Sequence, residues 1–174
     1  MALPGWTACA KCATGSYGST SGLSSCSACE TGSYANASGL VACDKCGAGS
    51  FTSETGLFVC SQCSSGTFTS DSGVSSCSLC MTGSYGTGNG QSACNACAEG
   101  SFASDSGLMY CSVCGTGTYT SAAGFSVCSE CATGTFGAGT GWTACAKCAT
   151  GSYGSTSGLS SCSACETGSY ANAS

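Results

Sequence analysis

Residues 9–29 read CAKCATGSYGSTSGLSSCSAC, and this stretch holds the pattern from which the rest of the chain is built. The pattern is C-x2-C-x2-G-[ST]-[YF]-x4-G-x3, a unit that first runs from Cys9 to Ser25 and in which a large apolar residue mostly follows the second glycine. The unit recurs ten times without a slip, the tenth copy starting at Cys162. So short a period indicates a repeat array rather than one packed domain.

A second period lies above the first. Residues 5–38 are identical to residues 141–174, an offset of 136 residues or eight units. We therefore divide the chain into a partial repeat at 1–8 and ten tandem repeats at 9–174, with a super-repeat of 136 residues. Identity that extends to surface positions such as Ser19 favours duplication, and we interpret the sequence as a window onto a longer array.

Composition restricts the class of protein. The 174 residues include 20 Cys and 28 Gly, only 6% are charged, and there is no His. A net charge of −5 argues against a nucleic-acid partner, because phosphate binding needs clustered Lys and Arg. No apolar run approaches the ~20 residues of a membrane span. Cysteine above about 8–10% is typical of a disulfide scaffold, which predicts an extracellular protein.

Each unit is predicted to form a short β-hairpin. The G-[ST]-[YF] segment is expected as one strand and the second G-x3 segment as the returning strand, with four turn residues such as Gly18–Ser21 between them. The glycine at the strand start permits a positive φ or a close backbone approach. The aromatic and apolar positions are expected to pack between repeats. The fold class is thus small, disulfide-rich and all-β: a linear, solenoid-like array of ten 17-residue hairpin repeats without helices.

Three disulfide arrangements can tile along this spacing: Cys12–Cys26, Cys9–Cys29, or paired units with Cys9–Cys26 and Cys12–Cys29. We favour the first, because it closes the base of the predicted hairpin. Pairing inside CxxC ranks last, because it is geometrically strained and typical of redox sites. Zinc is the alternative, since C-x2-C-x13-C-x2-C is close to zinc-ribbon spacing and five four-thiolate sites can be drawn. We predict no catalytic residues, no bound metal and no enzymatic activity, since no His is available as a general base.

The motif C-x2-C-x2-G-[ST]-[YF] followed by G-x3-C resembles the ephrin-receptor-like cysteine-rich repeat, which occurs in tandem in extracellular proteins. Cys12-Ala-Thr-Gly-Ser-Tyr with Cys26 is also similar to the first hairpin module of tumour-necrosis-factor receptors. The bracketing cysteines are joined in those modules, and this implies the same pairing here. Long regular arrays of the family imply surface fibres such as the glycosylated flagellar hairs (mastigonemes) of algae and protists.

Extended along the chain, the favoured pairing leaves Cys9 and Cys165 unpaired or joined between chains. It gives nine predicted disulfides: Cys12–Cys26, Cys29–Cys43, Cys46–Cys60, Cys63–Cys77, Cys80–Cys94, Cys97–Cys111, Cys114–Cys128, Cys131–Cys145 and Cys148–Cys162.

Covalent glycans are the only added groups that the sequence suggests. Asn36-Ala37-Ser38 is an N-glycosylation sequon in a predicted turn, and Asn172 begins its copy. Hydroxyl residues of the turns are candidates for O-glycans: Ser19, Thr20, Ser21, Thr69, Ser70, Ser72, Ser104 and Ser106.

The leading functional hypothesis is a non-enzymatic structural protein of an extracellular filament or surface appendage, whose partners are further copies of itself or other fibre subunits. The second is the cysteine-rich stalk or binding ectodomain of a cell-surface receptor, and the third is a zinc-binding array. A receptor site is expected to interrupt the repeat with an irregular loop, and no such interruption occurs in this sequence.

Overall fold

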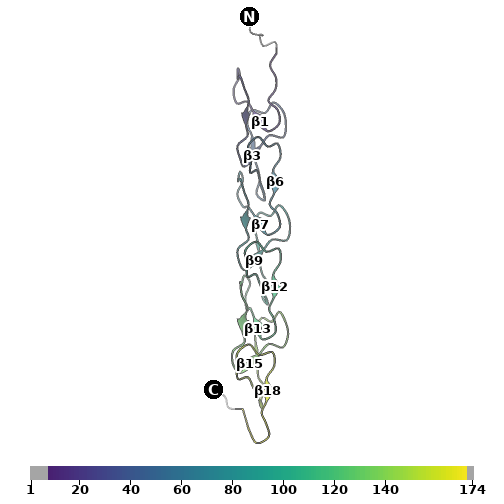
Figure 1. The fold of residues 1–174 in the computed structure, drawn as a ribbon, viewed down its shortest axis with the longest axis vertical. Helices are drawn as coiled ribbons and strands as arrows, with labels where there is room; N and C mark the ends of the chain where they lie inside the picture. Colours follow the sequence, from purple (N-terminus) through teal and green to yellow (C-terminus); the bar gives the residue numbers. More distant parts are fainter. Residues whose placement is uncertain (1–7, 172–174) are drawn as a thin grey trace. The chain divides into compact units, whose positions relative to one another are not determined.

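The computed structural model describes residues 8–171, and Figure 1 shows that their regular structure consists of short β-strands. Strands of two residues pair into nine two-stranded sheets, and no helix occurs within the described range. The all-β, disulfide-rich fold class is therefore confirmed. The residues fall into two compact units, one reaching Ser78 and including Asn89–Ala93, the other formed by Leu79–Gly88 and the residues from Cys94 on.

Strands of consecutive number pair with each other, β1 with β2 and so on to β17 with β18. Their bounds are β1 Ser16–Tyr17, β2 Ser27–Ala28, β3 Ser33–Tyr34, β4 Asp44–Lys45, β5 Ser50–Phe51, β6 Ser61–Gln62, β7 Thr67–Phe68, β8 Ser78–Leu79, β9 Ser84–Tyr85, β10 Asn95–Ala96, β11 Ser101–Phe102, β12 Ser112–Val113, β13 Thr118–Tyr119, β14 Ser129–Glu130, β15 Thr135–Phe136, β16 Ala146–Lys147, β17 Ser152–Tyr153 and β18 Ser163–Ala164.

The returning strand of each hairpin lies inside the next CxxC, so its predicted position in the second G-x3 segment was wrong. In the first hairpin Tyr17 pairs with Ser27, while residues 22–25 are not part of a strand. Gly22 has a φ of +77°, which interrupts a strand. In the next repeat the carbonyl of Leu40, the residue after the second glycine, accepts a hydrogen bond from Gly18 of the preceding hairpin at 3.0 Å. The segment therefore bonds between repeats, and not within its own hairpin.

A tight turn precedes the first strand of every hairpin and explains the constant Ser or Thr. The N–H of Ser16 donates to the carbonyl of Ala13 at 3.1 Å, and its hydroxyl donates to the same carbonyl at 2.7 Å. The third residue of the turn, Gly15, has a φ of +79°, which a side chain rarely adopts. The sequence shows that a hydroxyl residue is constant at this position, and the turn explains it, because the hydroxyl bonds to the first carbonyl of the turn.

Nine disulfides close the hairpins, each joining the second cysteine of one CxxC to the first of the next. They are Cys12–Cys26, Cys29–Cys43, Cys46–Cys60, Cys63–Cys77, Cys80–Cys94, Cys97–Cys111, Cys114–Cys128, Cys131–Cys145 and Cys148–Cys162. This is the arrangement favoured among the three that the spacing allows. Cys9 and Cys165 are free thiols.

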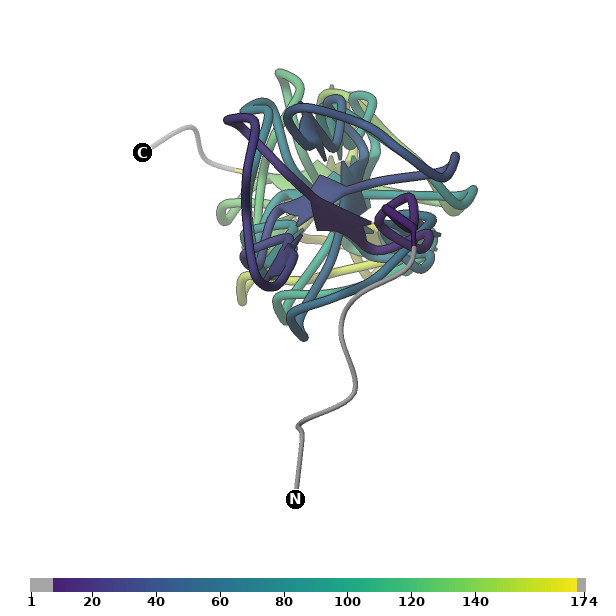
Figure 2. The same ribbon diagram turned by 90° about the horizontal axis from the view of Figure 1, so that it is seen from above.

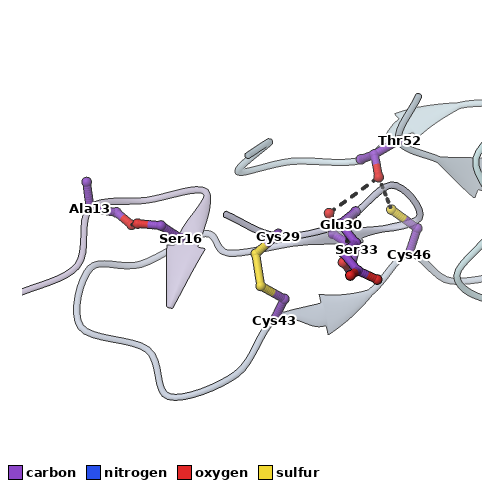
Figure 3. The surroundings of a disulfide bond; sticks show 8 residues. All are labelled: Ala13, Ser16, Cys29, Glu30, Ser33, Cys43, Cys46 and Thr52. Atoms are coloured by element: carbon purple, nitrogen blue, oxygen red, sulfur yellow. Dashed lines mark hydrogen bonds between the residues drawn. A yellow bond between two sulfur atoms is a disulfide. The ribbon is translucent and has the colours of Figure 1, made fainter. Parts of the chain in front are cut away.

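The second cysteine of the CxxC is the junction of three consecutive hairpins at Cys29, Cys46, Cys63, Cys97, Cys114 and Cys131. Cys29 is bonded to Cys43 of its own hairpin, and its N–H donates to the carbonyl of Gly15 in the preceding hairpin at 2.9 Å. Its carbonyl accepts the N–H of Gly56, in the loop of the following hairpin, at 2.7 Å. Cys29 has no exposed surface, and Figure 3 shows its surroundings. One residue thus uses its sulfur, donor and acceptor to join three hairpins.

This junction brings the backbones of two glycines together. Gly15 and Gly56 both bond to Cys29, and a Cβ placed on Gly15 would overlap the carbonyl of Gly56. The same overlap recurs in both units, for example between Gly83 and Gly124. The expected close approach at the strand-start glycine is therefore confirmed. The contact joins the first hairpin to the third, past the neighbouring repeat, which exceeds the nearest-neighbour packing expected of a linear array.

The buried core consists of cysteines and small residues, which differs from the expected aromatic core. The residue after each aromatic is Gly, Ala or Thr, and Ala35, Thr52 and Thr120 are at most 1% exposed. Oγ1 of Thr52 donates to the carbonyl of Ser33 at 3.3 Å and lies 4.0 Å from the sulfur of Cys46 (Figure 3). The preceding aromatic rings are mostly half-buried. Two-residue strands around a junction leave room only for small side chains inside.

The hairpin loops point outward from this core. In the first unit, the successive purple-to-blue loops project in different directions around the centre of the view (Figure 2). Most residues between the aromatic and the second glycine are exposed. The loop tips are therefore the surface on which any glycan or partner would meet the protein.

Alanine substitutions at two glycines with the same φ can distinguish two costs in stability: the cost of a positive φ and the cost of the close backbone approach. Gly83 and Gly151 both have a φ of +79°, but only Gly83 faces another backbone; Gly151 has open space. Gly151→Ala should lower the local free energy of unfolding by about 1–2 kcal/mol. Gly83→Ala should cost about 1–3 kcal/mol more through overlap with Gly124. The amide of Cys97 donates to the carbonyl of Gly83, and the amide of Cys165 donates to the carbonyl of Gly151. Hydrogen exchange at these two amides measures the two losses of stability. Equal losses in the two variants would contradict this packing.

The disulfides predict the number of reactive thiols. Denatured without reductant and in the presence of a chelator, the 174-residue chain should show two thiols, those of Cys9 and Cys165. A count near twenty would instead support the four-thiolate zinc array. A peptide map without reduction should link each pair of cysteines that are 14 residues apart.

Candidate functional surfaces

The described residues contain no cluster of side chains that could hold a metal ion. Within residues 8–171 no three His, Cys, Asp or Glu side chains converge as a metal site would require. The cysteines that a zinc array would use are joined in disulfides, apart from Cys9 and Cys165. A hollow of about 450 Å³ is lined by Tyr153, Cys165, Glu166 and Tyr170. Its lining includes one free thiol, that of Cys165.

The N-glycosylation candidate Asn36 lies on an accessible part of the first unit. It is exposed and follows the buried Ala35 directly. Ala37 and Ser38, which complete the sequon, are exposed as well. The second candidate, Asn172, lies outside the described residues. The geometry at Asn36 therefore leaves the side-chain amide open to a modifying enzyme.

Most candidate O-glycosylation positions are exposed hydroxyls of the hairpin loops, and one is not. Thr69 is only 6% exposed, and its hydroxyl donates to the carbonyl of Asp71 at 3.3 Å. The turn assignment that made Thr69 a candidate was wrong, because this position belongs to the small-residue core. The exposed candidates are Ser19, Thr20, Ser21, Ser70, Ser72, Ser104 and Ser106. Ser104 donates its hydroxyl to Oδ2 of Asp105 at 2.8 Å.

Exposed apolar side chains gather in pairs just before the first cysteine of some repeats. Phe58 and Val59 are both more than half exposed in the first unit, and Met109 and Tyr110 occupy the same two positions in the second unit. Other repeats carry small residues there, such as Ser75 and Ser76. The pairs contribute to no core, so the fold does not require them. They were missed from the sequence, where the same positions were assigned to a strand.

No helix among the described residues has the length and apolar character needed to cross a bilayer.

Comparison with known proteins gives one family. The family profile described as "Tyrosine-protein kinase ephrin type A/B receptor-like" matches residues 15–63, 32–76 and 100–148. No curated protein matches the chain. The three matches cover more than half of the sequence and fall in both compact units. Repeats of this kind, stapled by disulfides, are of an extracellular type and are consistent with a structural or ectodomain role. The chain therefore belongs to the ephrin-receptor-like family of cysteine-rich repeats.

Proposed function

We propose that this chain is a non-enzymatic structural protein of an extracellular filament or surface appendage. The observation that carries the proposal is the uniformity of the contacts between hairpins. The second cysteine accepts the N–H of the second glycine in the following repeat at 2.7–2.8 Å throughout both units, from Cys12 with Gly39 to Cys131 with Gly158. Each hairpin thus makes the same hydrogen bond with the following hairpin as the preceding hairpin makes with it. Such a contact does not close on itself, and it extends an array without limit.

Covalent closure suits this role outside the cell. Each disulfide encloses a loop of about 15 residues, worth about 3 kcal/mol in the chain-entropy model. The hairpins have no large apolar core, so these closures replace burial as the source of stability. An oxidising compartment keeps them intact, whereas cytosolic thiols would reduce them. A filament made of such units would resist unfolding and proteolysis.

A second candidate function, the stalk or binding ectodomain of a receptor, is favoured by the exposed apolar pairs. Phe58–Val59 and Met109–Tyr110 offer aromatic and thioether groups of the kind enriched in protein interfaces. Their absence from other repeats points to a local contact and not to a uniform lateral one. Phe58→Ser with Val59→Ser copies the residues of Ser75–Ser76 and should leave the fold intact.

Electron microscopy of the purified, oxidised protein tests the filament. Fibrils of uniform width should form as the concentration rises, because the contact between copies repeats the contact between hairpins. Reduction followed by alkylation serves as the control and should abolish them. Monodisperse single chains at all concentrations would contradict the filament. In that case, capture of a cell-surface partner by the parent chain, lost in the Phe58→Ser, Val59→Ser variant, would favour the receptor role.

Glycosylation of the loops is a separate part of the proposal. Secreted from a eukaryotic cell, the protein should carry an N-glycan at Asn36, because the sequon lies in an exposed loop. Intact-mass spectrometry should show one glycan fewer in Asn36→Gln. Asn89→Gln is the matched control, since Asn89 is exposed but lacks the third residue of a sequon. An unchanged mass, apart from the substitution, would rule out modification at Asn36.

A further inference from the structure

The covalent path from one end of the array to the other is much shorter than the chain. Each disulfide joins residues 14 apart in sequence, such as Cys12 and Cys26. Only two residues, Ser27 and Ala28, then separate Cys26 from Cys29, where the next disulfide begins. A force that pulls on the two ends follows this shorter path. Most of each repeat, such as the stretch 13–25 between Cys12 and Cys26, lies in a loop that the disulfide bypasses.

The length of this path per repeat is fixed by its two parts. The Cα atoms joined by a disulfide are 5.6–5.8 Å apart. Three residue steps, from Cys26 to Cys29, span at most about 10–11 Å. One repeat can therefore extend to about 16 Å, whereas the same repeat without its clamp would extend to about 60 Å. The disulfides thus shorten the extensible path almost fourfold.

The polypeptide segments of this path are already extended in the folded state. They are the second strands of the hairpins, such as β2 at Ser27–Ala28, and a β-strand already rises about 3.3 Å per residue. Pulling can straighten the angles between segments but cannot lengthen the segments much. The backbone hydrogen bonds between repeats are made largely by the bypassed loops, for instance at Gly39 and Gly56. Those loops need not be pulled out for the path to bear load.

We infer that the chain is a tension-bearing tether whose disulfides limit its extension to about 16 Å per repeat. Load passes through alternating disulfides and two-residue strands, while the loops keep the repeats in register and display surface groups. The inference rests on the proposed structural role only for its biological setting. A single chain bears tension by this path whether or not it assembles. Failure of filament assembly and failure of the load path are therefore separate results.

Stretching single molecules between beads attached to the two termini tests the load path. Without reductant the contour length should not exceed about 16 Å for each repeat from Cys12 to Cys162. Under constant force, dithiothreitol should add discrete steps of about 40–45 Å, one for each disulfide reduced, to a total of nine. In each step a thiolate of the reductant displaces one cysteine sulfur. The second thiol of the reductant then releases the other cysteine and forms a cyclic disulfide.

Two variants separate the covalent clamp from the packing around it. Cys80→Ala with Cys94→Ala should lengthen the unreduced chain by one step and leave eight for the reductant. Gly83→Ala weakens the loop closed by the same disulfide and should leave the contour length and all nine steps unchanged. An unreduced contour of about 60 Å per repeat, the length of the unclamped chain, would overturn the inference. So would steps of another size, or a Gly83→Ala chain as long as the double cysteine variant.

Discussion

The second cysteine of the CxxC, which is buried in every repeat from Cys29 to Cys131, is the constraint on which the rest of the structure depends. Its sulfur closes its own hairpin, its N–H bonds to the preceding hairpin and its carbonyl bonds to the following one, as Cys29 does with Cys43, Gly15 and Gly56. A disulfide alone does not fix how neighbouring hairpins are oriented. The two backbone hydrogen bonds at the same cysteine fix the orientation of the preceding and the following hairpin. Strands of two residues, which would be unstable alone, are held in this way.

The residue types around the junction follow from its crowding. Two backbones that both bond to one cysteine must approach each other, and only glycine fits where a Cβ on Gly83 would overlap the carbonyl of Gly124. The position after the aromatic faces the same interior and is limited to Gly, Ala or Thr. Side chains with little volume gain little from burial, so covalent closure carries the stability that apolar contacts supply in larger domains.

Sequence differences between the repeats lie outside the junction. Positions outside the junction are free to vary, and there the repeats differ: a sequon at Asn36, apolar pairs at Phe58–Val59 and Met109–Tyr110, and hydroxyls elsewhere. In the structural role that we propose, the junction supplies mechanical continuity and the loops supply surface chemistry. The two proposed roles use different residues of each repeat, so one short unit can serve both.

The sequence by itself determined the repeat, the all-β disulfide-rich class, the family resemblance and the need for glycine at the strand start, because strict spacing restricts what can tile along a chain. It also favoured the disulfide pairing, without removing the alternatives. Only the tertiary structure decided that the returning strand lies inside CxxC, that Thr69 is buried, and that Gly15 meets Gly56 of the third hairpin. These features arise from hydrogen bonds between different repeats, and a pattern within one repeat carries no information about which repeat will supply its partner.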